Sequence, residues 1–187
     1  MKNKVKFGLS NVHYAVMTEE DGTISYGTPT AIPGAVNLQL DAEGEITPFY
    51  ADNVTYYQAN KNGGYSGSLK IADIPKSFYL DVLGYQEDTN GALIENEDAV
   101  IKPFALMYEV KGDAVPRKAV LYNCAVSRPG TEANTQEDTT TPSTDTLNVS
   151  AVGRTDNKNV KAVMELSDTN QTAFDAFYDS VYTPKMI

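Results

Sequence analysis

The residue types that most often catalyse reactions or bind metals are scarce in this sequence. The chain of 187 residues has one histidine, His13, and one cysteine, Cys124. A catalytic triad would need His13 beside an activated serine or beside Cys124, and no nucleophile elbow accompanies either residue. A zinc site needs more histidines and cysteines than one of each. We therefore predict that the protein is not an enzyme, that it binds no metal and that His13 has a structural or solvent-facing role.

Carboxylates and glycines offer other kinds of chemistry. A carboxylate pair can hydrolyse glycosidic bonds, but among 25 acidic residues chance pairs are expected and none stands out. The turns that begin at Asp21 and Asp88 lack the ligand spacing of a calcium loop. The glycine-bearing stretch 63–67 lacks the Lys-Ser/Thr of a phosphate-binding loop. We therefore expect no cofactor.

Tyrosine is the abundant aromatic residue, with twelve copies and no tryptophan. A row of tyrosines can stack on sugars, or it can serve strands and protein interfaces. Sugar-stacking sites commonly use tryptophan, whereas tyrosine is frequent in protein interfaces. The composition therefore favours contacts with other proteins over contacts with sugars.

The charge of the chain restricts its partners. The formal net charge is -10 and the isoelectric point is near 4.5. A conventional nucleic-acid-binding protein presents a basic face to phosphate, so this class is disfavoured. No run approaches the roughly 20 apolar residues of a membrane helix, and no signal peptide is visible. Cys124 lies in an apolar alternation, which predicts a buried structural thiol in a protein made in the cytosol.

Period-two alternation of apolar and polar residues predicts a mainly β protein. We expect strands at 5–16, 23–26, 36–40, 54–57, 65–71, 104–110, 120–126, 146–152 and 160–166. The polar stretch 59–64 is interpreted as the loop of a hairpin. Two packed antiparallel sheets, forming a sandwich or a barrel-like pair, would bury this many half-apolar strands. The chain is expected to form a single domain over residues 1–187.

Two helices are predicted beside the strands. The first spans 73–84, with Asp73 as its N-cap and Gly84 as its stop. The second lies within 167–182 and begins with a capping box formed by Asp168 and Gln171. The segment 129–145 is polar and lacks large apolar residues, so we expect a flexible loop there.

Several short motifs resemble one known family. They are Phe-Tyr-Ala-Asp-Asn at 49–53, Gly-Tyr-Ser-Gly at 64–67, Ile-Pro at 74–75 and Val-Leu-Gly at 82–84. Together with Tyr56 and Leu69 they resemble the major tail proteins (tail tube proteins) of long-tailed, non-contractile bacteriophages. The resemblance implies a two-sheet β fold with a flanking helix that closes into six-membered rings. Such rings stack into the tail tube, whose lumen passes the genome.

The resemblance also implies partners and a location. The partners are further copies of the chain and the tail tip or baseplate, tape measure and tail terminator proteins. Genomic DNA would pass through without specific binding, and no membrane is involved. The protein would belong to the virion tail and be assembled in the cytoplasm of the bacterial host.

The residues expected to carry this role fall into two groups. The first is an assembly interface made of Tyr50, Asp52, Asn53, Tyr56, Asn60, Gly63, Gly64 and Tyr65. The second is a set of carboxylates facing the lumen, namely Asp41, Glu43 and Glu45. Because duplex DNA is densely anionic, an acidic bore would repel it and ease its passage.

Other functions stay open at this point. Acidity also serves simple solubility. A monomeric β-sandwich binding module, such as an adhesin or a carbohydrate-binding domain, fits the same strand pattern. A hydrolase that uses a carboxylate pair is a third possibility. Electron microscopy of concentrated protein would separate them, because only the first function predicts rings or tubes.

Overall fold

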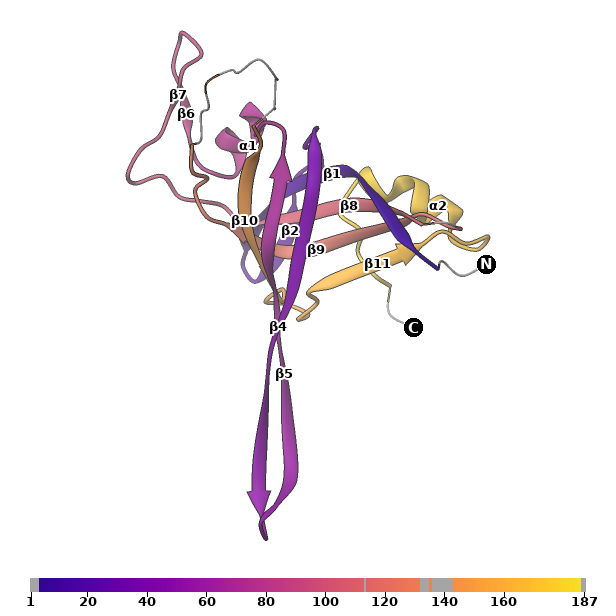
Figure 1. The fold of residues 1–187 in the computed structure, drawn as a ribbon. Coiled ribbons are helices and arrows are strands. Elements are labelled where there is room, and N and C mark those ends of the chain that lie inside the picture. The colour runs from indigo at the N-terminus through magenta and orange to yellow at the C-terminus, as the bar shows by residue number, and fades with distance from the viewer. Residues whose placement is uncertain (1–3, 113, 132–134, 136–142, 186–187) are drawn as a thin grey trace.

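The computed structural model describes residues 4–112, 114–131, 135 and 143–185, and strands dominate it (Figure 1). All strand pairs are antiparallel. One large sheet has the order β2-β1-β8-β9-β10-β5-β4, with β3 added to β1 and β11 added to β9, while β6 and β7 form a separate pair. The bounds are β1 Lys6–Glu20, β2 Thr23–Tyr26, β3 Thr30–Ala31, β4 Ala35–Ala51, β5 Val54–Ile71, β6 Gln86–Glu87, β7 Leu93–Ile94, β8 Phe104–Gly112, β9 Arg117–Val126, β10 Asp145–Val152 and β11 Lys161–Glu165.

The large sheet curls so that its two halves face each other. In Figure 1 the strands β1, β8 and β9 run across the direction of β4, β5 and β10. One buried cluster takes Tyr14 and Leu121 from the first half and Leu69 and Leu147 from the second. The mainly β class is therefore confirmed, and the two packed layers are two halves of one continuous sheet.

A short helix, α1 (Lys76–Asp81), fills one end of this core. Phe78 on α1 is fully buried and meets the rings of Tyr14 and Phe104 edge-on, with centroids 5.1 and 5.6 Å away. Burying such a side chain contributes about 1.5–3 kcal/mol. The helix therefore closes the end of the core rather than covering a sheet face from outside.

The predicted bounds of this helix, 73–84, were too wide. The N-cap is Pro75, in an extended conformation, and no side chain caps the helix. A residue before proline is kept out of the helical region by steric clash, so the helix cannot begin before Pro75. Asp73 is therefore not the N-cap, and the backbone N–H of Ile74 donates to Asp145 instead, at 3.1 Å. Gly84, with φ of +75°, follows the helix as expected.

The C-terminal segment covers the other face of the first half of the sheet. It contains α2 (Gln171–Asp175) and a 3₁₀ turn (Ala176–Tyr178), and Phe177 packs on Met107 and Tyr122. The expected capping box is wrong, because Asn170 occupies the N-cap position without a side-chain cap. Its side chain instead holds the preceding turn, accepting from the N–H of Ser167 and donating to the carbonyl of Glu165.

The largest correction concerns the hairpin of β4 and β5. The predicted loop at 59–64 is not a loop, because β5 runs without interruption from Val54 to Ile71 along β4. The turn lies at Asp52 and Asn53, whose φ angles are +51° and +58°. Positive φ at both positions is what a two-residue type I′ hairpin turn requires. Residues 44–62, called the arm below, project away from the body (Figure 1).

The predicted flexible loop at 129–145 falls largely on residues 132–134 and 136–142, which lie outside the described residues. β10 begins at the end of that segment, at Asp145. The strand predicted at 36–40 continues to Ala51 as β4, eleven residues beyond its predicted end. Outside the β4–β5 hairpin, the strands predicted from alternation are confirmed to within a few residues.

Candidate assembly surface

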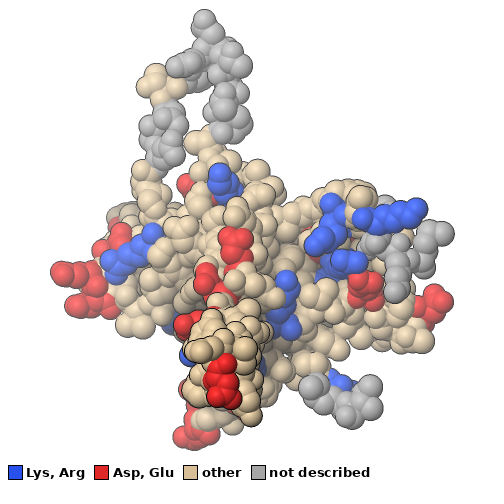
Figure 2. Space-filling view, turned by 60° about the horizontal axis from the view of Figure 1, so that its bottom comes forward, with Lys and Arg blue, Asp and Glu red and all other residues tan. Residues whose placement is uncertain are grey.

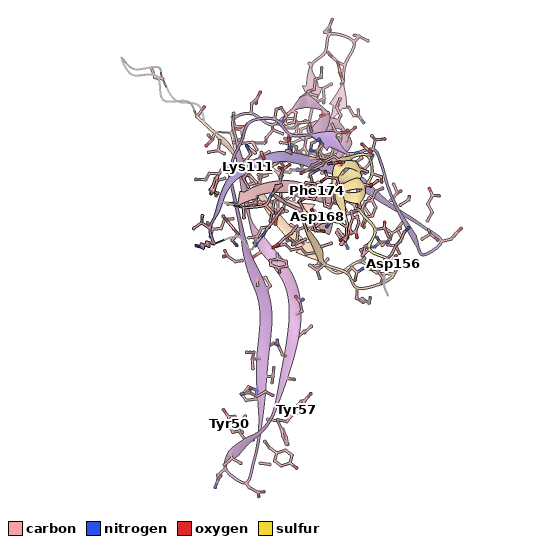
Figure 3. The ribbon with its side chains drawn as sticks, turned by 90° about the vertical axis from the view of Figure 1, so that its right-hand side faces the viewer. Tyr50, Tyr57, Lys111, Asp156, Asp168 and Phe174 are labelled. Carbon is pink, nitrogen blue, oxygen red and sulfur yellow. The ribbon has the colours of Figure 1, made fainter. Side chains whose placement is uncertain are left out.

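The arm exposes large apolar side chains that the described part of the body does not cover. Each is between 59 and 73 % exposed: Ile46, Phe49, Tyr50, Val54, Tyr56 and Tyr57. Figure 3 shows Tyr50 and Tyr57 near the far end of the arm, remote from the body. A lone two-stranded ribbon has little stability of its own, and clustered exposed apolar residues mark interaction sites. The arm is therefore the candidate contact surface of this chain.

The predicted interface residues divide between the arm and its base. Five of them, Tyr50, Asp52, Asn53, Tyr56 and Asn60, lie in the arm, and all are exposed. The other three, Gly63, Gly64 and Tyr65, lie where the arm joins the body or just beyond. Four of the five lie near the tip, whereas Asn60 pairs with Ile46 close to the base of the arm. The role of the group at an interface stays a prediction.

The backbone geometry explains why Gly63 and Gly64 lie at the base of the arm. The register between β4 and β5 shifts there, which marks a β-bulge. A Cβ on Gly64 would lie 2.0 Å from the carbonyl oxygen of Ala151, and the φ of this residue is +95°. Gly67 is equally tight, since its Cβ would lie 1.9 Å from the carbonyl oxygen of Gln39. These positions let three strands approach closely where the arm begins.

Sequence reasoning missed part of the arm. Ile46, Phe49, Val54 and Tyr57 were not predicted as interface residues, because 59–64 was interpreted as a loop. The signal was present in the Asp52-Asn53 pair, since both residue types tolerate positive φ and so favour a tight turn. Strands on both sides of that turn would have exposed the same aromatic residues.

The expected lumen carboxylates lie along β4. Asp41, Glu43 and Glu45 are all exposed and alternate with Leu40 and Ala42, so they share the face that points away from the core. Ser66 donates a hydrogen bond to Glu43, and Lys61 lies opposite Glu45 in the register. In Figure 2 acidic side chains line this side of the hairpin.

Small polar residues continue this face across the neighbouring strands. Ser66 and Ser68 on β5 lie beside Asn148 and Ser150 on β10 in the register. The side chains are short, so the face is smooth and hydrophilic. We call it the polar face. It also carries two lysines, Lys70 paired with Asn37 and Lys61 paired with Glu45.

The residues that could do chemistry have structural roles here. The His13 ring stacks on Tyr178 with centroids 4.4 Å apart, and its Nδ1 lies 3.0 Å from the carbonyl oxygen of Asn11. Cys124 is fully buried, which raises its pKa to about 12 and suppresses the thiolate that a nucleophile needs. Among the described residues, no three His, Cys, Asp or Glu side chains lie close enough to hold a metal ion. In the same residues, no helix has the length and apolarity to cross a membrane.

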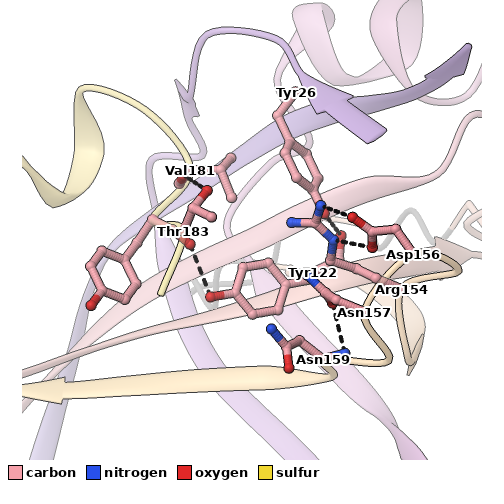
Figure 4. Close-up of polar contacts among 9 residues, drawn as sticks. Tyr26, Tyr122, Arg154, Asp156, Asn157, Asn159, Val181 and Thr183 are labelled. Carbon is pink, nitrogen blue, oxygen red and sulfur yellow. Dashed lines mark hydrogen bonds and ion pairs between the residues drawn. The ribbon is translucent and has the colours of Figure 1, made fainter. Parts of the chain in front are cut away.

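The most buried charge is also structural (Figure 4). Arg154 donates two hydrogen bonds to Asp156, at 2.9 and 2.6 Å, and this pairing lowers the pKa of the carboxylate. The guanidinium faces the rings of Tyr26 and Tyr122. Tyr122 in turn donates to the carbonyl oxygen of Tyr182, at 2.9 Å. The cluster fastens the C-terminal segment to the sheet and offers no open site.

The chain is a curled β sheet with an uncovered apolar arm, and its single histidine and single cysteine are stacked and buried, respectively. A family model described as phage tail tube protein matches residues 2–186, and the chain belongs to that family. The resemblance seen in the sequence is thereby confirmed. A search of curated proteins gives no match. The family is a structural one, not normally enzymatic, and its place is the tail of the virion.

Proposed function

We propose that copies of this chain form hexameric rings that stack into the tail tube and conduct the genome during its delivery. The observation that carries the proposal is the uncovered arm. From Gly44 to Ala51 its eight strand residues reach about 25 Å at ~3.4 Å each. That reach suits contact with a neighbouring copy beyond the surface of the body.

The polar face supplies a lining for the bore. Asp41, Glu43 and Glu45 point away from the core among short polar side chains, so each copy would contribute negative charge to the channel. Phosphate is repelled by the carboxylates of such a wall, and the short serine and asparagine side chains beside them keep that part of the wall smooth. This arrangement favours passage of DNA without specific binding.

Assembly in the host cytoplasm would begin from a template. The arm has little to hold it in a free monomer, so docking must repay the entropy lost when it is fixed. That cost opposes spontaneous growth until a tail tip presents a docking surface. The tape measure and tail terminator proteins would then set the length of the tube.

The test is to shorten the arm. Replacing residues 46–60 by Asn-Gly joins Glu45 to Lys61 through a two-residue turn and removes the exposed aromatic residues. We expect the thermal midpoint to stay close to that of the native chain, because none of the removed residues belongs to the core. Electron microscopy should show tubes for the native chain and none for the shortened chain.

A control variant changes an exposed apolar residue elsewhere. Val100→Ser removes the most exposed large apolar side chain outside the arm, which is 75 % exposed, and should leave tube formation intact. Tubes of normal length from the shortened chain would refute the role of the arm. A native chain that stays monomeric even with a tail tip present would refute the tube function itself.

A further inference from the structure

The curled sheet does not close, and its open seam is lined by apolar side chains. Among the described residues β4 pairs with β5 alone, and the first part of β1 pairs with β8 on one edge only. Between β1 and β4 lies a groove of about 530 Å³. Its floor is made of Leu9, Leu38, Leu40 and Val110, which also pack on the main core.

One end of the seam is closed by the chain itself. The N–H of Ile32 donates to the carbonyl of Val12 at 2.7 Å, and the N–H of Ala72 donates to the carbonyl of Gly34 at 2.8 Å. Residues 32–34 thus cross from β1 to the second half of the sheet. The groove is open along the rest of its length, where Phe7 and Val36 form an exposed rim.

Two lysines give this groove a positive charge. Lys6 and Lys161 both line it, and neither has a carboxylate within 4 Å among the residues that the structure describes. The ammonium of Lys161 lies 4.9 Å from the centre of the Tyr65 ring. Burial, and then the neighbouring charge of Lys6, lower the pKa of Lys161. Figure 2 shows basic side chains gathered on the body beside the arm. An anionic partner would relieve this repulsion.

We propose that the groove between β1 and β4 receives the tip of the arm from a second copy of this chain. The inference rests on the proposed tube function and names the surface on which the arm docks. The arm of the same chain cannot fill the groove, because β4 forms one wall and then continues away from the body (Figures 1 and 3).

The composition of the arm fits the groove in charge, and the tip supplies part of the contact area. The arm carries two carboxylates, Glu45 and Asp52, against the single lysine Lys61, and Asp52 lies at the turn that would enter the groove. Alternation places Phe49 and Tyr57 on one face of the ribbon and Tyr50 and Tyr56 on the other. A groove that receives one face would bury about 300–500 Å² from two rings at 150–250 Å² each. A standard stable interface buries about 800 Å² on each partner. One face of the tip therefore supplies about half of that surface, and the strands behind the tip would supply the rest.

Arm and groove are different surfaces of one chain, so their contact is heterologous. A heterologous contact leaves a free arm at one end and a free groove at the other, and it repeats unless a rotation closes it. This polarity suits the growth of a stack, in which each added copy offers the next docking site.

Disulfide cross-linking between two variants tests the inference. One preparation carries Tyr56→Cys at the tip, and the other carries Phe7→Cys or Val36→Cys at the groove rim. The native Cys124 is fully buried and does not interfere. A bridge requires Cβ atoms about 3.5–4.5 Å apart, so a bond forms only where tip and rim meet. The control is Val100→Cys, which is 75 % exposed and lies outside the groove.

The mixtures are oxidised as tubes, or in concentrated solution where no tubes form. We expect a covalent dimer at a rim position with a yield on the order of tenfold above the Val100→Cys control, since docking raises the effective concentration of the thiols. No dimer at either rim position, or equal yields with the control, would overturn the groove as the docking site. Tubes that form without the rim cross-link would contradict the groove as the docking site but not the tube function. A chain that never forms tubes would contradict the tube function itself.

Discussion

Gly64 shows how single atoms decide the geometry of this protein. Its φ of +95° and the carbonyl of Ala151 leave room for hydrogen alone. Sequence reasoning placed Gly64 in an interface because it occurs in a glycine-bearing motif. The structure shows that close packing between β5 and β10 already requires glycine there. Such a requirement depends on a strand more than 80 residues away, so the local pattern could not reveal it.

The first prediction follows from that contact. Gly64→Ala should lower the free energy of unfolding by more than the roughly 1–3 kcal/mol of backbone strain, because a backbone clash adds to it. Denaturant titration measures the loss. Gly130→Ala is the control, since nothing lies within 4 Å of its added Cβ. Equal stability of the two variants would contradict the packing argument.

The second prediction concerns alkaline pH. Burial raises the pKa of Cys124 from 9.0 and that of Tyr108 from 10.0 to about 12 in each case. Between these ordinary values and about 12 the unfolded chain therefore releases protons that the folded chain keeps. The contribution is fully present below the ordinary pKa, and stability falls as pH rises above it.

Urea titrations from pH 8 to pH 11 check this slope. Tyr108→Phe removes one such proton and should flatten the fall above pH 10 by up to about 1.4 kcal/mol per pH unit. An unchanged slope would show that this tyrosine ionises freely in the folded chain.

At the scale of elements, alternation located most strands and misjudged the ends of others. The body strands alternate because one face meets the core, so their pattern is visible in the sequence. The arm has no buried face, and its polar residues around Asn60 were therefore interpreted as a loop. The helix at α1 began later than predicted because the steric effect of Pro75 on Ile74 outweighed the capping preference of Asp73.

Phe177→Ala and Tyr57→Ala, on different elements, should have opposite effects: the first on stability and the second on tube formation. Phe177 is fully buried beneath the sheet, so Phe177→Ala should cost about 3–5 kcal/mol of unfolding free energy. Tyr57→Ala, on the arm, should change it by no more than about 0.5 kcal/mol but reduce tube formation. Denaturant titration and electron microscopy of both variants compare the two effects. Loss of stability in Tyr57→Ala would show that the arm packs on its own body.

At the scale of the whole molecule, fold class and family were within reach of the sequence. Alternation, two short helical segments and the motifs at 49–53 and 64–67 were sufficient for both. The open seam could not be predicted from the sequence, because the curl of the sheet brings together Leu9, Leu38 and Val110 from three distant strands. Curvature of that kind arises from the pairing order, which no local pattern contains.

The fourth prediction tests the bore. Asp41→Lys reverses one charge on the polar face in every copy and should slow DNA ejection from phage particles while tubes still assemble, because the wall then attracts phosphate. Asp98→Lys makes the same change in an exposed loop near α1 and should leave ejection unaffected. Equal ejection rates for the two variants would place Asp41 away from the bore.

The continuous strands of the arm also have a mechanical consequence. Tension applied at the Asp52–Asn53 turn runs along β4 and β5 and reaches the body as shear on the β5–β10 ladder between Tyr65 and Ile71. Ladder hydrogen bonds lie across the strand direction, so they share a load along the strand instead of breaking one after another. A flexible loop at 59–64 would have yielded first. In the proposed tube, the arm would therefore transmit tension from the core of one copy to the core of the next.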